Sequence, residues 1–135
     1  MELTRRDTLL TENQIKSSNW TTEINDRFGW MFGRGGFHAE CQGGWRHILY
    51  GLFDKIDRHV QGEECEDFQI TQVKEKYGTL RVYVCGGDDD VYAWIDEAEM
   101  ESGMTCEICA APGTTVNDGW MMTRCRRHTR RSGDQ

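Results

Sequence analysis

Two pairs of metal-binding side chains near the C-terminal end constrain the fold of this 135-residue chain more than any other feature. The first pair lies in Cys106-Glu107-Ile108-Cys109, and the second follows fifteen residues later in Cys125-Arg126-Arg127-His128. Two ligands separated by two residues can face one ion together, and two such pairs enclose a tetrahedral Zn²⁺. Between them, Pro112-Gly113 and Asn117-Asp118-Gly119 are typical of turns, so a short hairpin can return the second pair to the first. The sequence therefore predicts one structural zinc ion, with the ligands Cys106, Cys109, Cys125 and His128.

The predicted site is closed, because protein side chains supply all four ligands. A catalytic zinc keeps one position open for water, so hydrolysis at this metal is not expected. Nucleases built on a treble clef carry a general-base His on the hairpin, whereas residues 114–122 include no His. An alternative enzyme would pair the thiol of Cys41 with His38 or His47. A solvated His47 and a packed Cys41 are the simpler interpretations, so the sequence favours a protein that is not an enzyme.

The remaining cysteines and the hydropathy pattern bear on the compartment. Cys41, Cys65 and Cys85 are an odd remainder, which fits a reducing compartment better than a disulfide scaffold. We expect these three to be mostly buried free thiols. No apolar run approaches the roughly 20 residues of a membrane span, and residues 1–5 do not form a signal peptide. A cytoplasmic protein with no membrane partner is therefore expected.

An amphipathic helix is the clearest element of the central part. Its apolar residues recur at helical spacing, with Arg46, His47, Asp54, Lys55, Asp57 and Arg58 on the other face. Gly62 is expected to end it. The apolar positions are Trp45, Ile48, Leu49, Leu52, Phe53, Ile56 and Val60.

A β-hairpin and a second helix are expected next. Residues 68–74 and 80–84 are rich in β-formers, with a turn over residues 75–79. Leu80, Val82 and Val84 should face the helix. The run Asp88-Asp89-Asp90 favours a capped helix start over a metal site, and the helix should run to about residue 102, where Gly103 ends it. Its inward residues should be Val91, Trp94, Ile95 and Ala98.

The N-terminal part is less regular. Residues 17–19 are a plausible capping region for a helix, and the glycine-rich residues 33–36 are interpreted as a connecting loop. A short first helix is suggested by Leu3, Leu9, Leu10 and Ile15, and a second by Trp20, Ile24, Phe28 and Met31.

The predicted fold class is α+β, with a helix–β-hairpin–helix body and a C-terminal zinc ribbon or treble-clef-like finger. Residues 41–103 form the body, residues 1–40 form a helical and glycine-rich segment that packs on it, and residues 104–135 form the finger with its basic tail.

Several of these pieces together resemble a family of small uncharacterised proteins of bacteriophages and bacteria. The resemblance covers about residues 28–128 and rests on Cys41-Gln42-Gly43-Gly44-Trp45, Gln72-Val73-Lys74-Glu75-Lys76-Tyr77-Gly78-Thr79-Leu80-Arg81-Val82-Tyr83, Cys106-Glu107-Ile108-Cys109-Ala110-Ala111-Pro112-Gly113, Trp120, Thr123, Cys125 and His128. The chain departs from the family's usual glycines at Thr79 and Ala110. The resemblance implies an α/β body with a C-terminal zinc finger and suggests a phage accessory gene, acting in the cytoplasm of the host cell.

The charge distribution leaves two candidate binding surfaces. Residues 1–105 carry 11 Lys/Arg and 20 Asp/Glu, a balance of −9, so this part should repel nucleic acid. The first candidate surface is the basic tail, where arginines beside an aromatic ring suit phosphate contact and base stacking. Its residues are Trp120, Arg124, Arg126, Arg127, Arg130 and Arg131. The second is a hairpin face suited to an anionic small ligand such as a nucleotide, with Lys74, Lys76, Tyr77 and Arg81 near the turn of Gly43 and Gly44.

The sequence as a whole favours a small non-catalytic zinc-binding protein of phage type that binds a host or phage macromolecule. Ordinary solvated charges are the alternative for both candidate surfaces. A nucleic-acid-binding finger that acts through the tail, a nucleotide-sequestering protein that uses the hairpin face and, last, an enzyme that uses Cys41 and a His remain as other functions.

Overall fold

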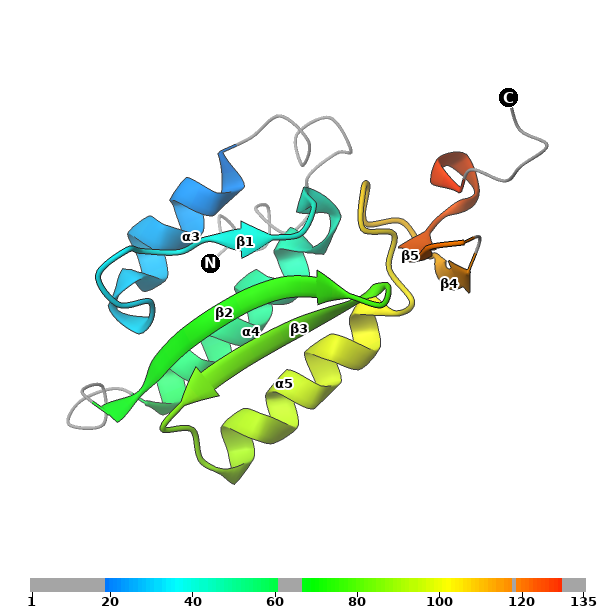
Figure 1. Cartoon of the computed structure of the whole chain (residues 1–135). Helices are drawn as coiled ribbons and strands as arrows, with labels where there is room; N and C mark the ends of the chain where they lie inside the picture. The colour runs from blue at the N-terminus through cyan, green and yellow to red at the C-terminus, as the bar shows by residue number, and fades with distance from the viewer. Residues whose placement is uncertain (1–18, 61–66, 118, 130–135) are drawn as a thin grey trace.

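The computed structural model describes residues 19–60, 67–117 and 119–129 and shows a mixed α+β architecture (Figure 1). The α-helices and strands in chain order are α3 (Trp20–Phe28), β1 (Ala39–Glu40), α4 (Arg46–His59), β2 (Gln69–Lys76), β3 (Thr79–Cys85), α5 (Asp89–Ser102), β4 (Thr114–Asn117) and β5 (Met121–Arg124). Short 3₁₀ helices are η1 (Gly29–Met31), η2 (Gly43–Trp45) and η4 (Arg126–His128). Each helix in these residues is too short or too polar to span a bilayer.

The body is a three-stranded sheet in the order β1-β2-β3, with α4 and α5 on one face (Figure 1). β2 and β3 form the antiparallel hairpin that the sequence predicts. β1 is a parallel neighbour of β2 that sequence reasoning missed, because Ala39 and Glu40 are too few residues for an alternating pattern. The strands β4 and β5 form a separate two-stranded sheet beyond the end of this hairpin.

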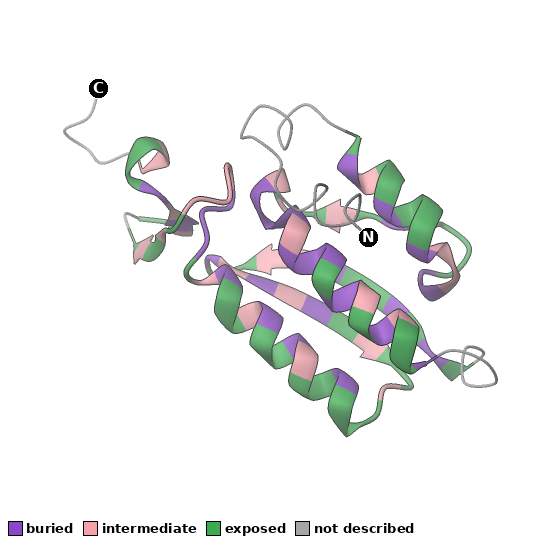
Figure 2. Cartoon of the chain, turned by 180° about the vertical axis from the view of Figure 1, so that it is seen from behind, coloured by how far each residue is buried: buried purple, intermediate pink, exposed green. Residues whose placement is uncertain are grey.

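The predicted amphipathic helix is confirmed at the centre of the core. Every apolar position expected to face inward on residues 45–60 is buried, and Trp45, Leu49, Phe53 and Ile56 are fully enclosed. Seen from behind in Figure 2, α5 presents mainly exposed residues on the side turned away from the sheet. The hydrophobic effect therefore holds α4 on the sheet between its two neighbouring helices, α3 and α5.

The expectation that Arg46 lies on a solvated face of α4 is wrong. Its side chain is only 4% exposed, forms an ion pair with Glu23 of α3, and lies over the ring of Tyr50 at 5.8 Å from the centroid. The periodicity of α4 alone cannot show that α3 covers this face. A buried guanidinium needs such a partner, because an unpaired charge away from water is costly.

The turn between β2 and β3 is tighter than the predicted turn over residues 75–79. The strands continue to Lys76 and resume at Thr79, so only Tyr77 and Gly78 form the turn. Both have positive φ, 56° at Tyr77 and 92° at Gly78, as a two-residue type I′ hairpin turn requires. Asn-Gly would have indicated this turn in the sequence, whereas a bulky Tyr in the left-handed region is uncommon.

The second predicted helix is confirmed as α5, with its N-terminus capped by the acidic run. The Asp88 carboxylate accepts a hydrogen bond from the Val91 N–H at 3.0 Å. Nε2 of His59, at the end of α4, lies 2.7 Å from the other carboxylate oxygen. The hydrogen bond with His59 has the largest effect on the pKa of Asp88, and both hydrogen bonds lower it. The cap therefore also joins α4 to α5.

The side chains of α5 also close the exposed edge of β3. The Leu80 N–H donates to Ser102 Oγ at 2.9 Å, and the Val82 N–H donates to the Glu99 carboxylate at 3.1 Å. An unpaired row of strand N–H groups is a template for aggregation and costs free energy when it is buried. Helix side chains replace the missing strand at these two positions.

Other expectations fall on residues that the structure does not describe. They are the first helix suggested by Leu3, Leu9, Leu10 and Ile15, the capping residues 17 and 18, the helix stop at Gly62, and the thiol of Cys65. Asn19 is the N-cap residue of α3, but its side chain forms no capping hydrogen bond.

Substitution of Ser102 by Ala should test the closed edge. Ser102 is fully buried, so Ser102→Ala leaves the Leu80 N–H without an acceptor. Such a group costs about 1–3 kcal/mol of unfolding free energy. Urea denaturation should show this loss, whereas Thr22→Ala on the exposed face of α3 should change little. Equal effects of the two substitutions would contradict the role of Ser102.

Candidate metal centre

The four predicted ligands come from two turns that face each other. The first turn follows α5, where the Ala110 N–H donates to the Cys106 carbonyl at 2.9 Å and the Cys106 N–H donates to the Ala111 carbonyl at 2.8 Å. Ala110 has φ 75°, in the region that favours glycine. The second turn consists of Cys125, which follows β5, and of η4, whose N-cap residue is Cys125. The β4–β5 hairpin thus returns the chain to the first turn, as the sequence predicts.

The ligand atoms of Cys106, Cys109, Cys125 and His128 all lie within 4.8 Å of one another. The Cys109 and Cys125 sulfurs are 3.6 Å apart, and His128 Nδ1 lies 3.2 Å from the Cys125 sulfur and 3.6 Å from the Cys106 sulfur. A tetrahedron with zinc–ligand bonds of the usual length has S···S edges of about 3.8 Å and S···N edges of about 3.5 Å. The cluster therefore has the size of a tetrahedral metal site.

Cys106, Cys109 and Cys125 are free thiols, and none of them belongs to a disulfide. Their separations far exceed a disulfide bond length of about 2.05 Å. Burial raises the pKa of the Cys109 thiol to about 11, and the nearby sulfurs of Cys125 and Cys106 act in the same direction, against a hydrogen bond from Ala111. A bound cation would reverse this effect, because a coordinating thiol loses its proton. The donor set of three sulfurs and one imidazole fits zinc.

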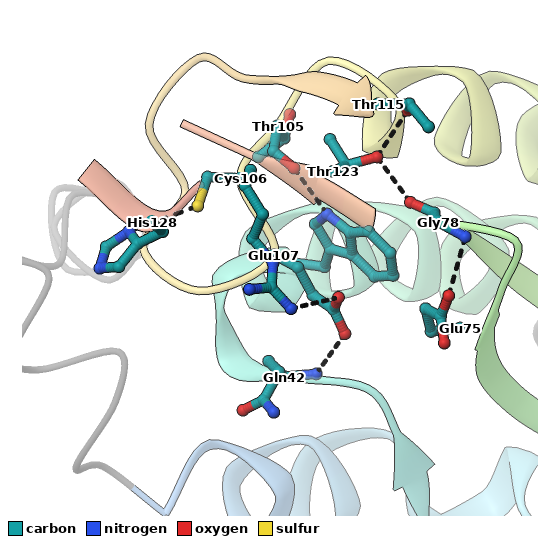
Figure 3. A network of polar contacts seen from close by, with 11 residues as sticks. Gln42, Glu75, Gly78, Thr105, Cys106, Glu107, Thr115, Thr123 and His128 are labelled. Atoms are coloured by element: carbon teal, nitrogen blue, oxygen red, sulfur yellow. Dashed lines mark hydrogen bonds and ion pairs between the residues drawn. The ribbon is translucent and has the colours of Figure 1, made fainter. Parts of the chain in front are cut away.

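The first ligand turn packs directly on the start of α4. The Gly44 N–H donates to the Glu107 carbonyl at 2.6 Å. The indole N–H of Trp45 donates to the Thr105 carbonyl at 2.9 Å (Figure 3). A Cβ at position 44 would lie 2.3 Å from the carbonyl oxygens of Cys106 and Glu107. Glycine is therefore required here by close backbone approach.

The side chain of Glu107 forms a second link between the two parts. Its carboxylate accepts a hydrogen bond from the Gln42 N–H at 3.0 Å and lies 3.8 Å from the guanidinium of Arg124 (Figure 3). The side chain is buried, and burial raises its pKa, whereas the Gln42 N–H and Arg124 lower it. A buried carboxylate with these partners fixes the orientation of the ligand turn.

A chain of hydroxyl groups joins the β4–β5 hairpin to the β2–β3 turn. Thr123 Oγ1 donates to the Gly78 carbonyl at 2.6 Å and lies 2.6 Å from Thr115 Oγ1 (Figure 3). Gly78 has no side chain to separate the hairpins, and a Cβ there would lie 3.1 Å from Thr115. Sequence reasoning missed Glu107, Thr123 and Gly78 as linking residues, because no local pattern marks contacts between distant segments.

The structure divides the predicted basic tail. Arg124 is engaged by Glu107, Arg126 and Arg127 lie exposed on η4, and residues 130 and 131 are outside the described part. Trp120, at the β4–β5 turn, lines a pocket with Lys74, Lys76 and Tyr77 of the other hairpin. Trp120, which was predicted to belong to the tail surface, therefore shares a pocket with residues of the predicted hairpin face.

The structure confirms one part of the predicted hairpin face and corrects another. Arg81 lies opposite Lys74 in the β2–β3 register, as expected for neighbours on one face. The turn of Gly43 and Gly44 is not free for a ligand, because the metal-binding turn packs on Gly44. Gly44 therefore belongs to the junction with the finger, and Gly43 precedes it in η2.

The cysteines outside the cluster differ from one another. Cys41 is half-buried, whereas Cys85 is exposed, contrary to the expectation of buried thiols. Burial, with the nearby carboxylates of Glu107 and Glu75, raises the pKa of Cys41 to about 12. A thiol that stays protonated is a weak nucleophile, which weighs against chemistry at Cys41.

No family model, curated protein or solved structure matches this chain. The residues and their geometry are therefore the basis for a functional interpretation.

Two Gly→Ala substitutions should differ in their effect on the unfolding free energy, one at the junction and one at an exposed position of α4. Gly44→Ala should lower the unfolding free energy by about 1–3 kcal/mol, because the methyl group overlaps the backbone of the ligand turn. Gly51→Ala on α4, where nothing lies within 4 Å of the added Cβ, should raise it by about 0.5–1 kcal/mol. Chemical denaturation measures both, and a tolerated Gly44→Ala would contradict the close junction.

Proposed function

We propose that the cluster holds one structural Zn²⁺ in a treble-clef-like finger. A turn with two Cys ligands, a β-hairpin, and a short terminal helix with Cys125 at its N-cap and His128 at its end support this assignment. His128 coordinates through Nδ1, which is the ring nitrogen nearest the sulfurs. The ion has four protein ligands and no position for a substrate, so its contribution is to folding.

The function that follows is a non-catalytic binding protein of phage type, whose partner is a host or phage macromolecule. The observation that carries this proposal is the closed cluster, built on a junction of buried polar contacts. Such a centre fixes the finger against the body instead of exposing reactive groups. The phage context is proposed on the sequence resemblance alone, since no family model matches the chain.

Exposed aromatic side chains support a binding role. Trp120 is 70% exposed and Tyr77 is 66% exposed, and both lie on the hairpin turns that the finger and the body bring together. Large aromatic residues left in solvent are enriched at binding sites, because they gain much free energy when a partner covers them.

Metal analysis tests the structural part of the proposal. The purified protein should contain about one zinc per chain, and Cys106→Ser should lose the metal and unfold the C-terminal third. Cys85→Ser, which removes an exposed thiol, should retain both metal and fold. Elemental analysis and limited proteolysis measure these outcomes. A metal-free, fully folded wild-type protein would refute the zinc assignment.

Mass spectrometry of molecules that co-purify with the protein from its host tests the binding role. The same macromolecule should be recovered with the wild type and with Cys85→Ser, and it should be lost with Cys106→Ser.

A further inference from the structure

A pocket of about 430 Å³ lies between the β2–β3 turn and the β4–β5 turn. Figure 1 shows these two hairpins meeting at the end of the body sheet. The contacts of Gly78 with Thr115 and Thr123 hold the hairpins together beside the pocket. Its volume lies in the range of small-ligand sites. Its lining includes Lys74, Lys76, Tyr77, Asn117, Trp120 and Met121.

Two aromatic rings give the pocket its apolar surface. Trp120 comes from the finger and Tyr77 from the body, and each is more than half exposed. Tyr77 stands at φ 56°, a conformation that costs free energy for a bulky residue. Such strain is concentrated at functional sites, where a side chain must be held in a particular direction.

Two cations lie at the same site. Lys74 and Lys76 alternate along β2, so they share the face of the sheet that is turned away from α4 and α5. Neither forms an ion pair with a residue of the described ranges. The Lys76 ammonium lies 5.6 Å from the centre of the Tyr77 ring. A positive group beside an open aromatic ring suits a ligand that is both aromatic and anionic.

Carboxylates restrict how such a ligand lies. Glu75 lines the pocket, but its carboxylate accepts a hydrogen bond from the Gly78 N–H at 2.8 Å. The adjoining pocket shares Trp120 with the first and is lined by Glu40, Glu75 and Glu107, against one cation, Arg124, which lies 3.8 Å from Glu107. An anionic group is therefore attracted to the lysine end and repelled from the other end.

We propose that this pocket binds an unpaired nucleobase with its phosphate, the base stacking on Trp120 and Tyr77 and the phosphate contacting Lys74 and Lys76. The proposal rests on the proposed function, because the zinc-stabilised finger supplies Trp120. A single-stranded nucleic acid and a free nucleotide share this chemistry. The arrangement differs from binding through the arginine tail, because Arg126 and Arg127 do not line the pocket.

The test measures fluorescence anisotropy of a labelled oligothymidylate of about 12 nucleotides, and calorimetry with thymidine monophosphate, on the full chain. Trp120→Ala should weaken binding about 5- to 150-fold, the loss that follows removal of one base-stacking contact. Lys74→Gln with Lys76→Gln should also weaken binding. If the oligonucleotide is the ligand, this double variant should reduce the salt slope by about 1.4, because each phosphate contact on a single strand contributes about 0.7.

Two control variants change residues of the same chemical types that do not line the pocket. Tyr92→Ala removes an exposed aromatic residue of α5, and Lys55→Gln removes a surface lysine of α4. Both should bind as the wild type does. Zinc content and melting temperature are measured for every variant, so that a loss of fold is distinguished from a loss of the site.

The outcomes separate the alternatives. Binding of the oligonucleotide alone identifies a single strand, and equal binding of the mononucleotide identifies a free nucleotide; either supports the site if it depends on Trp120. A zinc-loaded, folded protein that binds neither probe overturns the site and leaves the zinc proposal standing. Binding that survives Trp120→Ala but is lost with Arg126→Gln and Arg127→Gln overturns it in favour of the tail. A polyglutamate peptide that binds equally well through Trp120 overturns it in favour of an acidic protein segment.

Discussion

The structure of the finger depends on one close backbone contact, the hydrogen bond from the Gly44 N–H to the Glu107 carbonyl. It places the first ligand turn on η2, immediately before the central helix α4, at a distance that no side chain at position 44 would permit. Trp45 packs in the body core and also donates to the Thr105 carbonyl. Trp45 therefore joins the hydrophobic core to the ligand turn, and the stability of one contributes to that of the other.

The same junction explains why polar residues are buried in a chain with a limited apolar content. Glu107 and Thr123 lie inside because each meets partners from a different segment. Arg46 is buried for a comparable reason between α3 and α4. Buried polar groups are tolerated when their hydrogen bonds are satisfied, and they then select one arrangement over others. Here they join α3 to α4 and the finger to the body.

The sequence correctly predicted the elements that are determined by interactions between residues close together in the chain. The periodicity of residues 45–60 identifies α4 because burial repeats with the helical turn, and Asp88 identifies the start of α5 because a cap acts within three residues. The ligand cluster follows from covalent spacing. The strand β1, the burial of Arg46 and the linking residue Thr123 depend on segments far away in the chain. The turn between β2 and β3 was predicted over residues 75–79 and not narrowed to Tyr77 and Gly78, because Tyr is an unusual choice for that conformation.

The C-terminal region contains two separate features, the closed ligand cluster and the open aromatic pocket. The ligands set the path of the β4–β5 hairpin, whose turn carries Trp120 to within reach of the lysines on β2. None of the four ligands lines that pocket. In the proposed finger, the bound metal would act on the pocket only through geometry, because it would hold the two ligand turns together. A small chain could gain the proposed binding surface in this way without enlarging its core, since one ion and a few buried hydrogen bonds would replace the packing that a larger domain uses.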